Sequence, residues 1–208
     1  MIELHTWGTP NGRKISIMLE ECGLPYSVHK VDISKGEQFK PEFLRISPNN
    51  RIPAIVDPDG PGGKPISLFE SGAILIYLAD KKKKFMPADA AKRYDALQWL
   101  MWQMGGFGPM LGQAHHFLRA APTKIEYGMK RYVDEAKRLY GVLDKQLASN
   151  AFVAGEEYTI ADMSIFPWAA RHEWHTVNLA DFPNVKRWYD IVNARPAVTK
   201  GMSVPYLN

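Results

Sequence analysis

Cysteine is nearly absent from this sequence of 208 residues, which contains only Cys22. One cysteine cannot form a disulfide within the chain, and a cysteine-poor sequence is typical of a reducing compartment. Residues 1–5 (MIELH) lack the basic and apolar regions of a signal peptide. No apolar run approaches the roughly 18 residues needed to cross a membrane. We therefore expect a cytoplasmic protein that does not enter a membrane.

A strong excess of charge of one sign is also absent. Lys and Arg number 26 and Asp and Glu number 22, which gives a net charge of +4. This excess is too small and too dispersed to indicate a nucleic-acid partner. The densest run, Lys81–Lys84, is interpreted as a solvated surface segment at a linker. A content of 46% hydrophobic residues is that of an ordinary globular protein with room for one large domain or two modest ones.

The first eighty residues follow an α/β pattern. Alternation over residues 2–7 predicts a strand, apolar spacing over residues 15–22 predicts a helix, and residues 26–31 predict a second strand. Strand, helix and strand within about thirty residues form a βαβ unit with parallel pairing. Further along, the pattern predicts a short helix at 41–46, a hairpin of strands 52–57 and 66–69, and a buried helix over 73–79.

The remainder of the chain shows helical patterns only. Residues 125–147 carry apolar side chains at steps of three and four, and residues 185–192 form a later helix that ends before Pro196. Gly105–Pro109 should kink or interrupt a helix, and Thr159–Asp162 has the form of a capping box. We predict an α/β domain over residues 1–81 and an all-helical domain over residues 88–208.

This order of elements, with Pro53 before the third strand, resembles the thioredoxin fold. With a helical second domain the whole chain resembles a cytosolic glutathione transferase. In that family the proline is cis, an acidic residue and a serine open the third helix as the γ-glutamyl-binding motif, and a capping box lies in the helical domain. Glu70-Ser71-Gly72-Ala73-Ile74 and Thr159–Asp162 match the latter two motifs. The resemblance implies glutathione as a bound co-substrate, with no metal.

General physical chemistry supports a binding site at Glu70 and Ser71. A helix N-terminus presents free N–H groups and a positive partial charge, so the Ser71 hydroxyl and amide can hold a carboxylate. Glu70 can pair with an ammonium group. Together they suit the zwitterionic end of a γ-glutamyl peptide. The alternative is that Ser71 is only a helix cap and Glu70 is a solvated acid.

The chain lacks a cysteine where thioredoxins carry Cys-X-X-Cys, and Thr9-Pro10-Asn11-Gly12 stands there instead. Any thiol must therefore come with the ligand. No tyrosine precedes Tyr26 and no serine precedes Ser16, unlike the common tyrosine and serine classes of the family. The Thr9–Gly12 segment, together with Gly105–Gln113 and His115–Phe117, resembles the bacterial Nu class. That resemblance implies disulfide-bond reduction by thiol–disulfide exchange, with peroxidase activity as a further option.

The same resemblance implies roles for individual residues. Asn11 and Thr9 would orient and stabilise the reactive sulfur of glutathione, although a helix cap is an equal alternative for Asn11 before the resemblance is considered. The residues that match glutathione-binding positions, in addition to Pro53, Glu70 and Ser71, are Gln38 and Arg51 for the glycyl end, Ile52 for the cysteinyl backbone, and Arg131 for a ligand of the neighbouring subunit in a homodimer.

Several alternatives stay open. Arg131 is otherwise an exposed charge on an amphipathic helix, and Phe107 and Met110 either line a second-substrate pocket or belong to the helical core. The second substrate would be a small disulfide or electrophile. Two other functions remain: conjugation of glutathione to small electrophiles, and a glutathione-transferase-like module that binds without catalysis.

Overall fold

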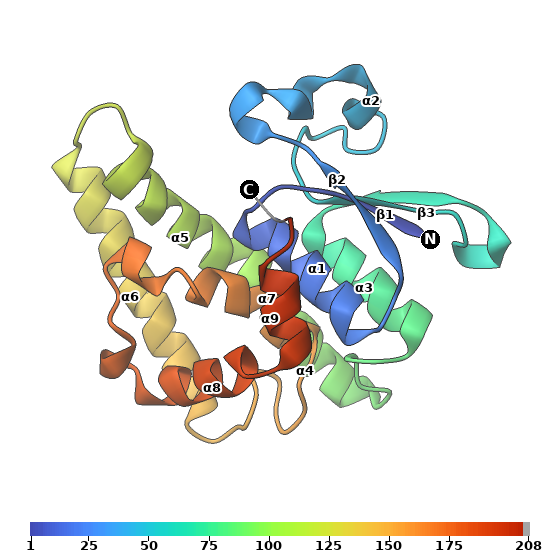
Figure 1. Ribbon diagram of the computed structural model, residues 1–208. Coiled ribbons are helices and arrows are strands. Elements are labelled where there is room, and N and C mark those ends of the chain that lie inside the picture. Colours follow the sequence, from blue (N-terminus) through green and yellow to red (C-terminus); the bar gives the residue numbers. More distant parts are fainter. Residues whose placement is uncertain (206–208) are drawn as a thin grey trace. The chain divides into compact units, whose positions relative to one another are not determined.

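The computed structural model describes residues 1–205, which form two compact units. Met1–Lys84 and the segment from Arg195 onward make up the first, and Phe85–Ala194 makes up the second. The first contains the sheet and the second is helical, which confirms the predicted fold class (Figure 1). The division after Lys84 falls at the lysine run, whereas the segment from Arg195 groups with the sheet and not with the preceding helices.

A four-stranded sheet in the order β2-β1-β3-β4 organises the first unit. Strand β1 (Ile2–Thr6) pairs in parallel with β2 (Tyr26–Lys30), as the βαβ pattern predicts. Strand β3 (Ala54–Asp57) is antiparallel to both β1 and β4 (Ile66–Phe69). The alternation in β1 explains its position, because the side chains of alternate residues are buried on one face of the sheet.

Helices cover both faces of this sheet. Helices α1 (Pro10–Glu21) and α3 (Ser71–Lys82) pack against each other on one face, and α2 (Pro41–Leu44) lies on the other side (Figure 1). Phe43 of α2 is buried with Val31 and Ala54 in a small core cluster. Two short 3-10 turns, Ile33–Lys35 and Glu37–Phe39, connect β2 to α2.

The last helix of the chain, α9 (Pro196–Met202), packs closely on α1. The Ser16 hydroxyl donates to the Gly201 carbonyl at 2.6 Å, and a Cβ at Gly201 would lie 2.6 Å from the Ile17 Cα. The sequence analysis missed this helix because it treated Arg195-Pro196 only as a stop. Proline is also common at the first position of a new helix, because an N–H group at that position would have no intrahelical partner.

The second unit is built from α4 (Ala90–Trp102), α5 (Gly108–His115), α6 (Glu126–Leu147), α7 (Ile160–Ala169) and α8 (Pro183–Asn193). A π-helical segment, Gln103–Phe107, separates α4 from α5, which confirms the interruption expected from the glycine-rich segment. Another π-helical segment, His116–Ala120, follows α5. No helix among residues 1–205 combines the length and apolar character needed to cross a membrane.

Helix α7 lies in the core of the second unit and begins with the expected capping box. The Thr159 hydroxyl accepts from the Ala161 amide at 3.2 Å, and Asp162 accepts from the Thr159 amide at 2.9 Å. The same carboxylate accepts from the Val153 amide at 2.9 Å and from Trp188 Nε1 at 2.8 Å. One buried side chain thus joins α7 to α8 and to the loop before α7.

Candidate active site

Helix α1 begins at the Thr9-Pro10-Asn11-Gly12 segment. Thr9 is its N-cap, and its Oγ1 accepts from the Gly12 amide at 3.2 Å. A Cβ at Gly12 would lie 2.2 Å from Thr6 Oγ1, so glycine allows the helix to start this close to β1. The hydroxyl of Thr9 accepts one hydrogen bond as a cap and retains its own proton for donation.

Asn11 is the second residue of α1 and is half-buried. Since Thr9 makes the capping hydrogen bond, the helix-cap alternative for Asn11 does not hold in this structure. Its side-chain amide lies in the first turn of α1, where the helix dipole favours an anion. A thiolate brought by a ligand is such an anion, so Asn11 and Thr9 are suitably placed to stabilise one.

The protein's own thiol is unsuited to this chemistry. Cys22 is buried, and burial raises the pKa of its thiol to about 11. A thiol reacts as the thiolate, so a raised pKa makes the side chain inert near neutral pH. With no other cysteine in the sequence, the reactive sulfur has to come from a bound thiol.

Helix α3 begins with the predicted Glu70-Ser71 pair. Glu70 occupies the N-cap position with a φ of 68°, which is uncommon for any residue but glycine, and its side chain is exposed. Its side chain makes no capping hydrogen bond. Ser71, the first helical residue, is buried. Ser71 is therefore not the cap of this helix, and its hydroxyl is held in another way.

That hydroxyl accepts a hydrogen bond from Lys14 Nζ at 3.3 Å. Lys14 is fully buried, and desolvation lowers the pKa of its ammonium to about 7, although the charge of Glu70 partly offsets this effect. The apolar spacing over residues 15–22 did not identify Lys14 as a buried residue of α1. Its spacing of one helical turn from Met18, on the apolar stripe, was the signal that could have found it.

The loop before β3 carries the next group of predicted residues. The Ile52–Pro53 peptide bond is cis, which confirms the expectation from the family resemblance. Ile52 is half-buried and packs on the Val31, Phe43 and Ala54 cluster, whereas Arg51 is exposed. The contact of Ile52 with the cysteinyl part of glutathione and that of Arg51 with its glycyl end stay predictions.

Gln38 lies in the 3-10 turn Glu37–Phe39 and is 8% exposed. Among residues 1–205, its Oε1 atom is buried and has no hydrogen-bond partner. Buried polar groups in proteins are nearly always paired. The orphan amide at this position is thus consistent with a ligand that completes its hydrogen bonds.

In the second unit the structure separates two of the predicted residues. Phe107 is fully buried between Trp102 and Tyr140, with ring centroids 5.1 and 5.2 Å away, so it belongs to the helical core and offers no surface to a substrate. Met110 is half-buried and lines a cavity of about 590 Å³ together with Arg131. Arg131 is exposed on α6, with its guanidinium 6.0 Å from the Tyr132 ring centroid.

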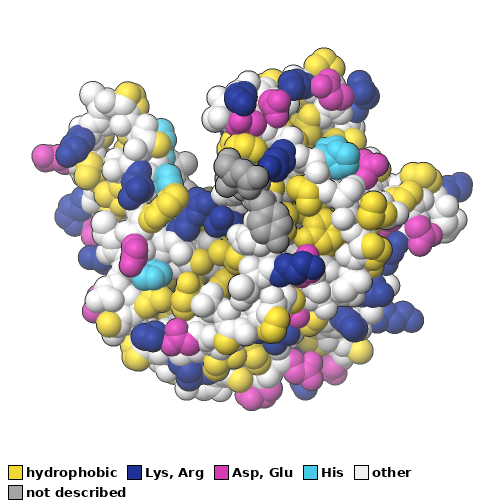
Figure 2. All heavy atoms as spheres, viewed as in Figure 1, with side chains coloured by type: hydrophobic (Ala, Val, Ile, Leu, Met, Phe, Trp, Pro, Cys, Tyr) yellow, Lys and Arg dark blue, Asp and Glu magenta, His cyan; other side chains and the backbone are white. Residues whose placement is uncertain are grey.

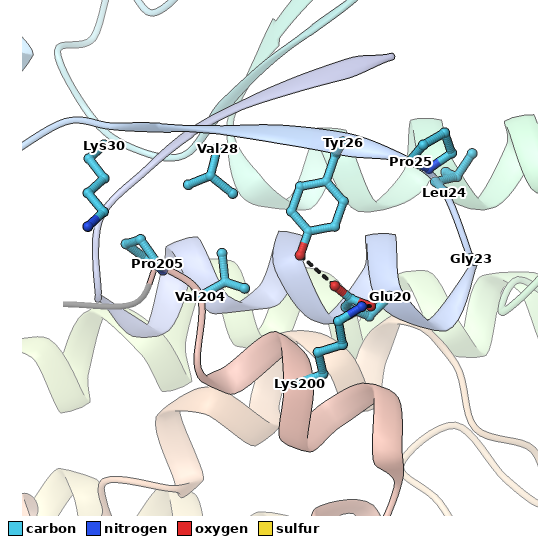
Figure 3. A pocket seen from close by; sticks show the side chains of 10 residues that line it. All are labelled: Glu20, Gly23, Leu24, Pro25, Tyr26, Val28, Lys30, Lys200, Val204 and Pro205. Carbon is cyan, nitrogen blue, oxygen red and sulfur yellow. Dashed lines mark hydrogen bonds and ion pairs between the residues drawn. The ribbon is translucent and has the colours of Figure 1, made fainter. Parts of the chain in front are cut away.

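The first unit contains a cavity of about 680 Å³ (Figure 3). It opens between the α1–β2 turn, β2 and the C-terminal end of α9, where Tyr26 donates to Glu20 at 2.6 Å and Lys200 pairs with Glu20 at 2.8 Å. None of the predicted glutathione-binding residues lines it. We therefore assign it no part in the site.

One group of side chains on β1 and β2 has the spacing of metal ligands. The nearest ligand atoms of Glu3, His5 and His29 lie within 4.8 Å of one another. Glu3 and His5 alternate with the buried residues of β1 and therefore lie on its other face, and His29 of β2 stacks on His5. On the face of the molecule shown in Figure 2, basic and acidic side chains are interspersed, in line with the dispersed charge of the sequence.

Comparison of the chain with known proteins identifies its family. Residues 9–81 match the glutathione S-transferase N-terminal domain and residues 109–196 match the glutathione S-transferase C-terminal domain. The chain is 51% identical to disulfide-bond oxidoreductase YfcG of Escherichia coli (strain K12), over 97% of this chain and 94% of that protein. It is 43% identical to YghU of the same organism, also a disulfide-bond oxidoreductase, over 100% of this chain and 76% of that protein.

Solved structures agree with these sequence matches. A glutathione transferase from Burkholderia graminis, with two glutathione molecules bound per subunit, has a TM-score of 0.94 and 48% identity over 100% of this chain and 89% of that chain. One from Pseudomonas putida, with one glutathione disulfide bound per subunit, has a TM-score of 0.94 and 48% identity over 98% of this chain and 91% of that chain. The protein therefore belongs to the glutathione transferase family.

Proposed function

We propose that this protein binds glutathione and uses its thiolate to reduce disulfide bonds. The observation that carries the proposal is the combination at α1: a capped N-terminus with Thr9 and Asn11, and a sole cysteine that is buried with a raised pKa. The relatives named disulfide-bond oxidoreductases support this reaction, and the relatives crystallised with glutathione or its disulfide support the co-substrate.

The reaction proceeds in two exchanges. The thiolate of bound glutathione attacks one sulfur of the disulfide substrate, a new S–S bond forms, and the other sulfur leaves as a thiolate that takes up a proton. A second glutathione thiolate then attacks the glutathione sulfur of this mixed disulfide. The second substrate thiol is released, and glutathione disulfide is the oxidised product. Asn11 and Thr9 stabilise the attacking thiolate through their side-chain donors.

The glutathione molecule is held by several elements of the first unit. Ser71 binds the γ-glutamyl carboxylate at the start of α3, and Glu70 pairs with the α-ammonium. Ile52 pairs its backbone with the cysteinyl part beside Pro53, and Gln38 and Arg51 bind the glycyl end. The unpartnered Oε1 of Gln38 supports this assignment, because it can accept from the glycyl N–H of glutathione while the side-chain NH2 group donates to the glycyl carboxylate.

We also propose an oligomeric state and a cellular compartment for the protein. We place the protein in the cytoplasm as a homodimer of the Nu type, in which Arg131 reaches the ligand of the neighbouring subunit. The exposure of Arg131 on α6, beside the cavity that Met110 lines, supports a contact outside its own chain. The second substrate is a small disulfide, and Met110 is the remaining candidate to contact it.

A second candidate function, conjugation of glutathione to small electrophiles, uses the same thiolate. Turnover of a small soluble disulfide and of an aryl halide, each measured with saturating glutathione, separates the two. We expect the disulfide to be the better substrate by at least about tenfold in kcat/KM, and Asn11→Ala to lose a similar factor in kcat by removing a donor to the sulfur. Preference for the aryl halide would favour conjugation, and full turnover by Asn11→Ala would remove Asn11 from the mechanism.

A further inference from the structure

We propose that Lys14 is a positioning residue for the γ-glutamyl end of glutathione. Its ammonium donates to Ser71 and thereby turns the serine hydroxyl toward the ligand's carboxylate, while its positive charge favours that carboxylate. The inference rests on the proposed function, because it concerns how the glutathione site is built. It adds a residue that neither the sequence pattern nor the family motifs assign.

The direction of the hydrogen bond between Lys14 and Ser71 determines where the serine hydroxyl proton points. Lys14 Nζ lies 3.3 Å from Ser71 Oγ. An ammonium group has three donors and no acceptor, so the serine oxygen must accept in this contact. The hydroxyl proton of Ser71 then points away from Lys14. A carboxylate can only accept, so a serine held in this orientation is prepared to donate to it.

The burial of Lys14 and Ser71 strengthens the electrostatic effect of the ammonium on a bound carboxylate. Lys14 is 1% exposed and Ser71 is 3% exposed. A charge in such surroundings interacts more strongly with a nearby carboxylate than it would in water. An ammonium group behind Ser71 therefore adds electrostatic attraction to the N–H groups at the start of α3. The ligand carboxylate in turn adds a negative charge close to the buried ammonium.

Several charged groups lie on α1 and on the elements packed against it, and Glu70 is the one that acts on Lys14. Glu70 raises the pKa of Lys14, but desolvation outweighs it and brings that pKa to about 7. Glu20 and Glu21 on α1 pair with Lys200 and Arg195 of the α9 segment. The other charged groups on α1 and on the elements packed against it are Arg13 on α1, Glu3 and His5 on β1, and Asp80, Lys81 and Lys82 on α3.

Two consequences distinguish this role from a structural one. A carboxylate placed at Ser71 favours the charged form of Lys14, so binding above neutral pH must be accompanied by proton uptake. In the free protein, by contrast, the buried ammonium is a cost. Replacing it with an apolar side chain of similar length should leave the fold as stable or more stable while weakening the ligand.

The test is isothermal titration calorimetry with S-methylglutathione, whose blocked sulfur removes the titration of the thiol. Titrations in buffers of different ionisation enthalpy give the number of protons taken up. From a pKa of about 7 in the free protein, we expect uptake of about 0.9 proton at pH 8 and about 0.1 at pH 6. Lys14→Met should bind at least about tenfold more weakly at pH 6, and at pH 8 it should take up only the small fraction of a proton that the ligand's own amino group requires.

Lys64→Met, at an exposed lysine of the same unit, is the matched control and should bind as the unsubstituted protein does. If the unsubstituted protein does not bind S-methylglutathione, the proposed glutathione site itself fails. If it binds while Lys14→Met keeps the same affinity, or if it takes up no proton at pH 8, the role of Lys14 is overturned. Lys14→Gln, which keeps a donor for Ser71 but has no charge, decides the matter by the same two readouts should Lys14→Met not fold.

Discussion

At the scale of single residues, the start of α3 shows how a backbone position and a buried charge can make a binding site. Glu70 adopts a positive φ of 68° directly before the helix, and its side chain remains exposed. Ser71 follows at the first helical position, buried and contacted by Lys14. The unusual backbone conformation places an acid and a hydroxyl next to each other at the positive end of a helix dipole.

Ser71→Ala tests the assignment of the γ-glutamyl carboxylate. Loss of the hydroxyl removes a donor to that carboxylate and leaves the Lys14 ammonium without this partner. We expect the Kd of glutathione to rise at least about tenfold, because a hydrogen bond to a charged group contributes about 1.5–3 kcal/mol. Ser67→Ala, at an exposed position of β4, should leave the Kd unchanged. Equal affinity of both variants, measured by calorimetry, would contradict the assignment.

The sequence could predict those site residues that belong to local motifs. Thr9, Asn11, Pro53, Glu70 and Ser71 stand at element boundaries, where turn and helix-start patterns can be recognised. Lys14 could not be found in this way. It is buried in contact with Ser71 of α3, which comes from a distant part of the chain. The burial of Phe107 likewise depends on Tyr140 of another helix.

At the scale of secondary-structure elements, the capping box of α7 is a case in which a short pattern predicted both position and geometry. The pattern did not reveal how much else Asp162 does. Its carboxylate accepts from Val153, Thr159 and Trp188, and it is fully buried. Burial raises the pKa of Asp162 to about 6 even though these hydrogen bonds act in the opposite direction.

Asp162→Asn should therefore destabilise the helical unit despite being isosteric. Whichever way the amide is oriented, its NH2 group faces a backbone or indole donor that the carboxylate now accepts from. We expect a loss of about 1–3 kcal/mol in the free energy of unfolding. Asp89→Asn is the matched control, because Asp89 caps α4 at an exposed position and asparagine caps equally well. Equal unfolding midpoints in urea for the two variants would contradict this account.

Other elements could not be predicted from a local sequence pattern. The sequence predicted an interruption near Gly105–Pro109 but could not specify a π-helical segment, because this depends on how α4 and α5 each pack in the unit. Helix α9 was missed for a different reason. Its short sequence has no amphipathic period long enough to recognise, and its position is set by contacts with α1.

At the scale of the whole molecule, the two units meet different chemical demands. The first brings together polar groups at helix starts, and the second buries a large aromatic core. That core contains a polar exception, His175, which is fully buried and has no hydrogen-bond partner for either ring nitrogen among residues 1–205. Desolvation lowers the pKa of His175 to about 4, and the nearby His115, Arg171 and His172 act in the same direction.

His175 should make the helical unit sensitive to acid. In the unfolded chain a histidine takes up a proton near its ordinary pKa of about 6.5, whereas the folded protein keeps His175 neutral until about pH 4. The unfolded state therefore binds more protons in this window, so the contribution is fully present above about pH 6.5 and is lost as the pH falls. Between pH 7.5 and pH 5 the loss amounts to at most about 2 kcal/mol.

His175→Phe removes this titration and replaces an unpartnered polar ring with an apolar one of similar shape. Urea unfolding followed by tryptophan fluorescence should show a smaller fall in stability between pH 7.5 and pH 5 for His175→Phe than for the unsubstituted protein. At pH 7.5 the variant should be at least as stable, because no hydrogen bond of the His175 ring is lost among the described residues. His116→Gln, at an exposed histidine, controls for the loss of a histidine as such. If the unsubstituted protein and His175→Phe lose stability in parallel, the burial of a neutral His175 does not govern the response of this unit to acid.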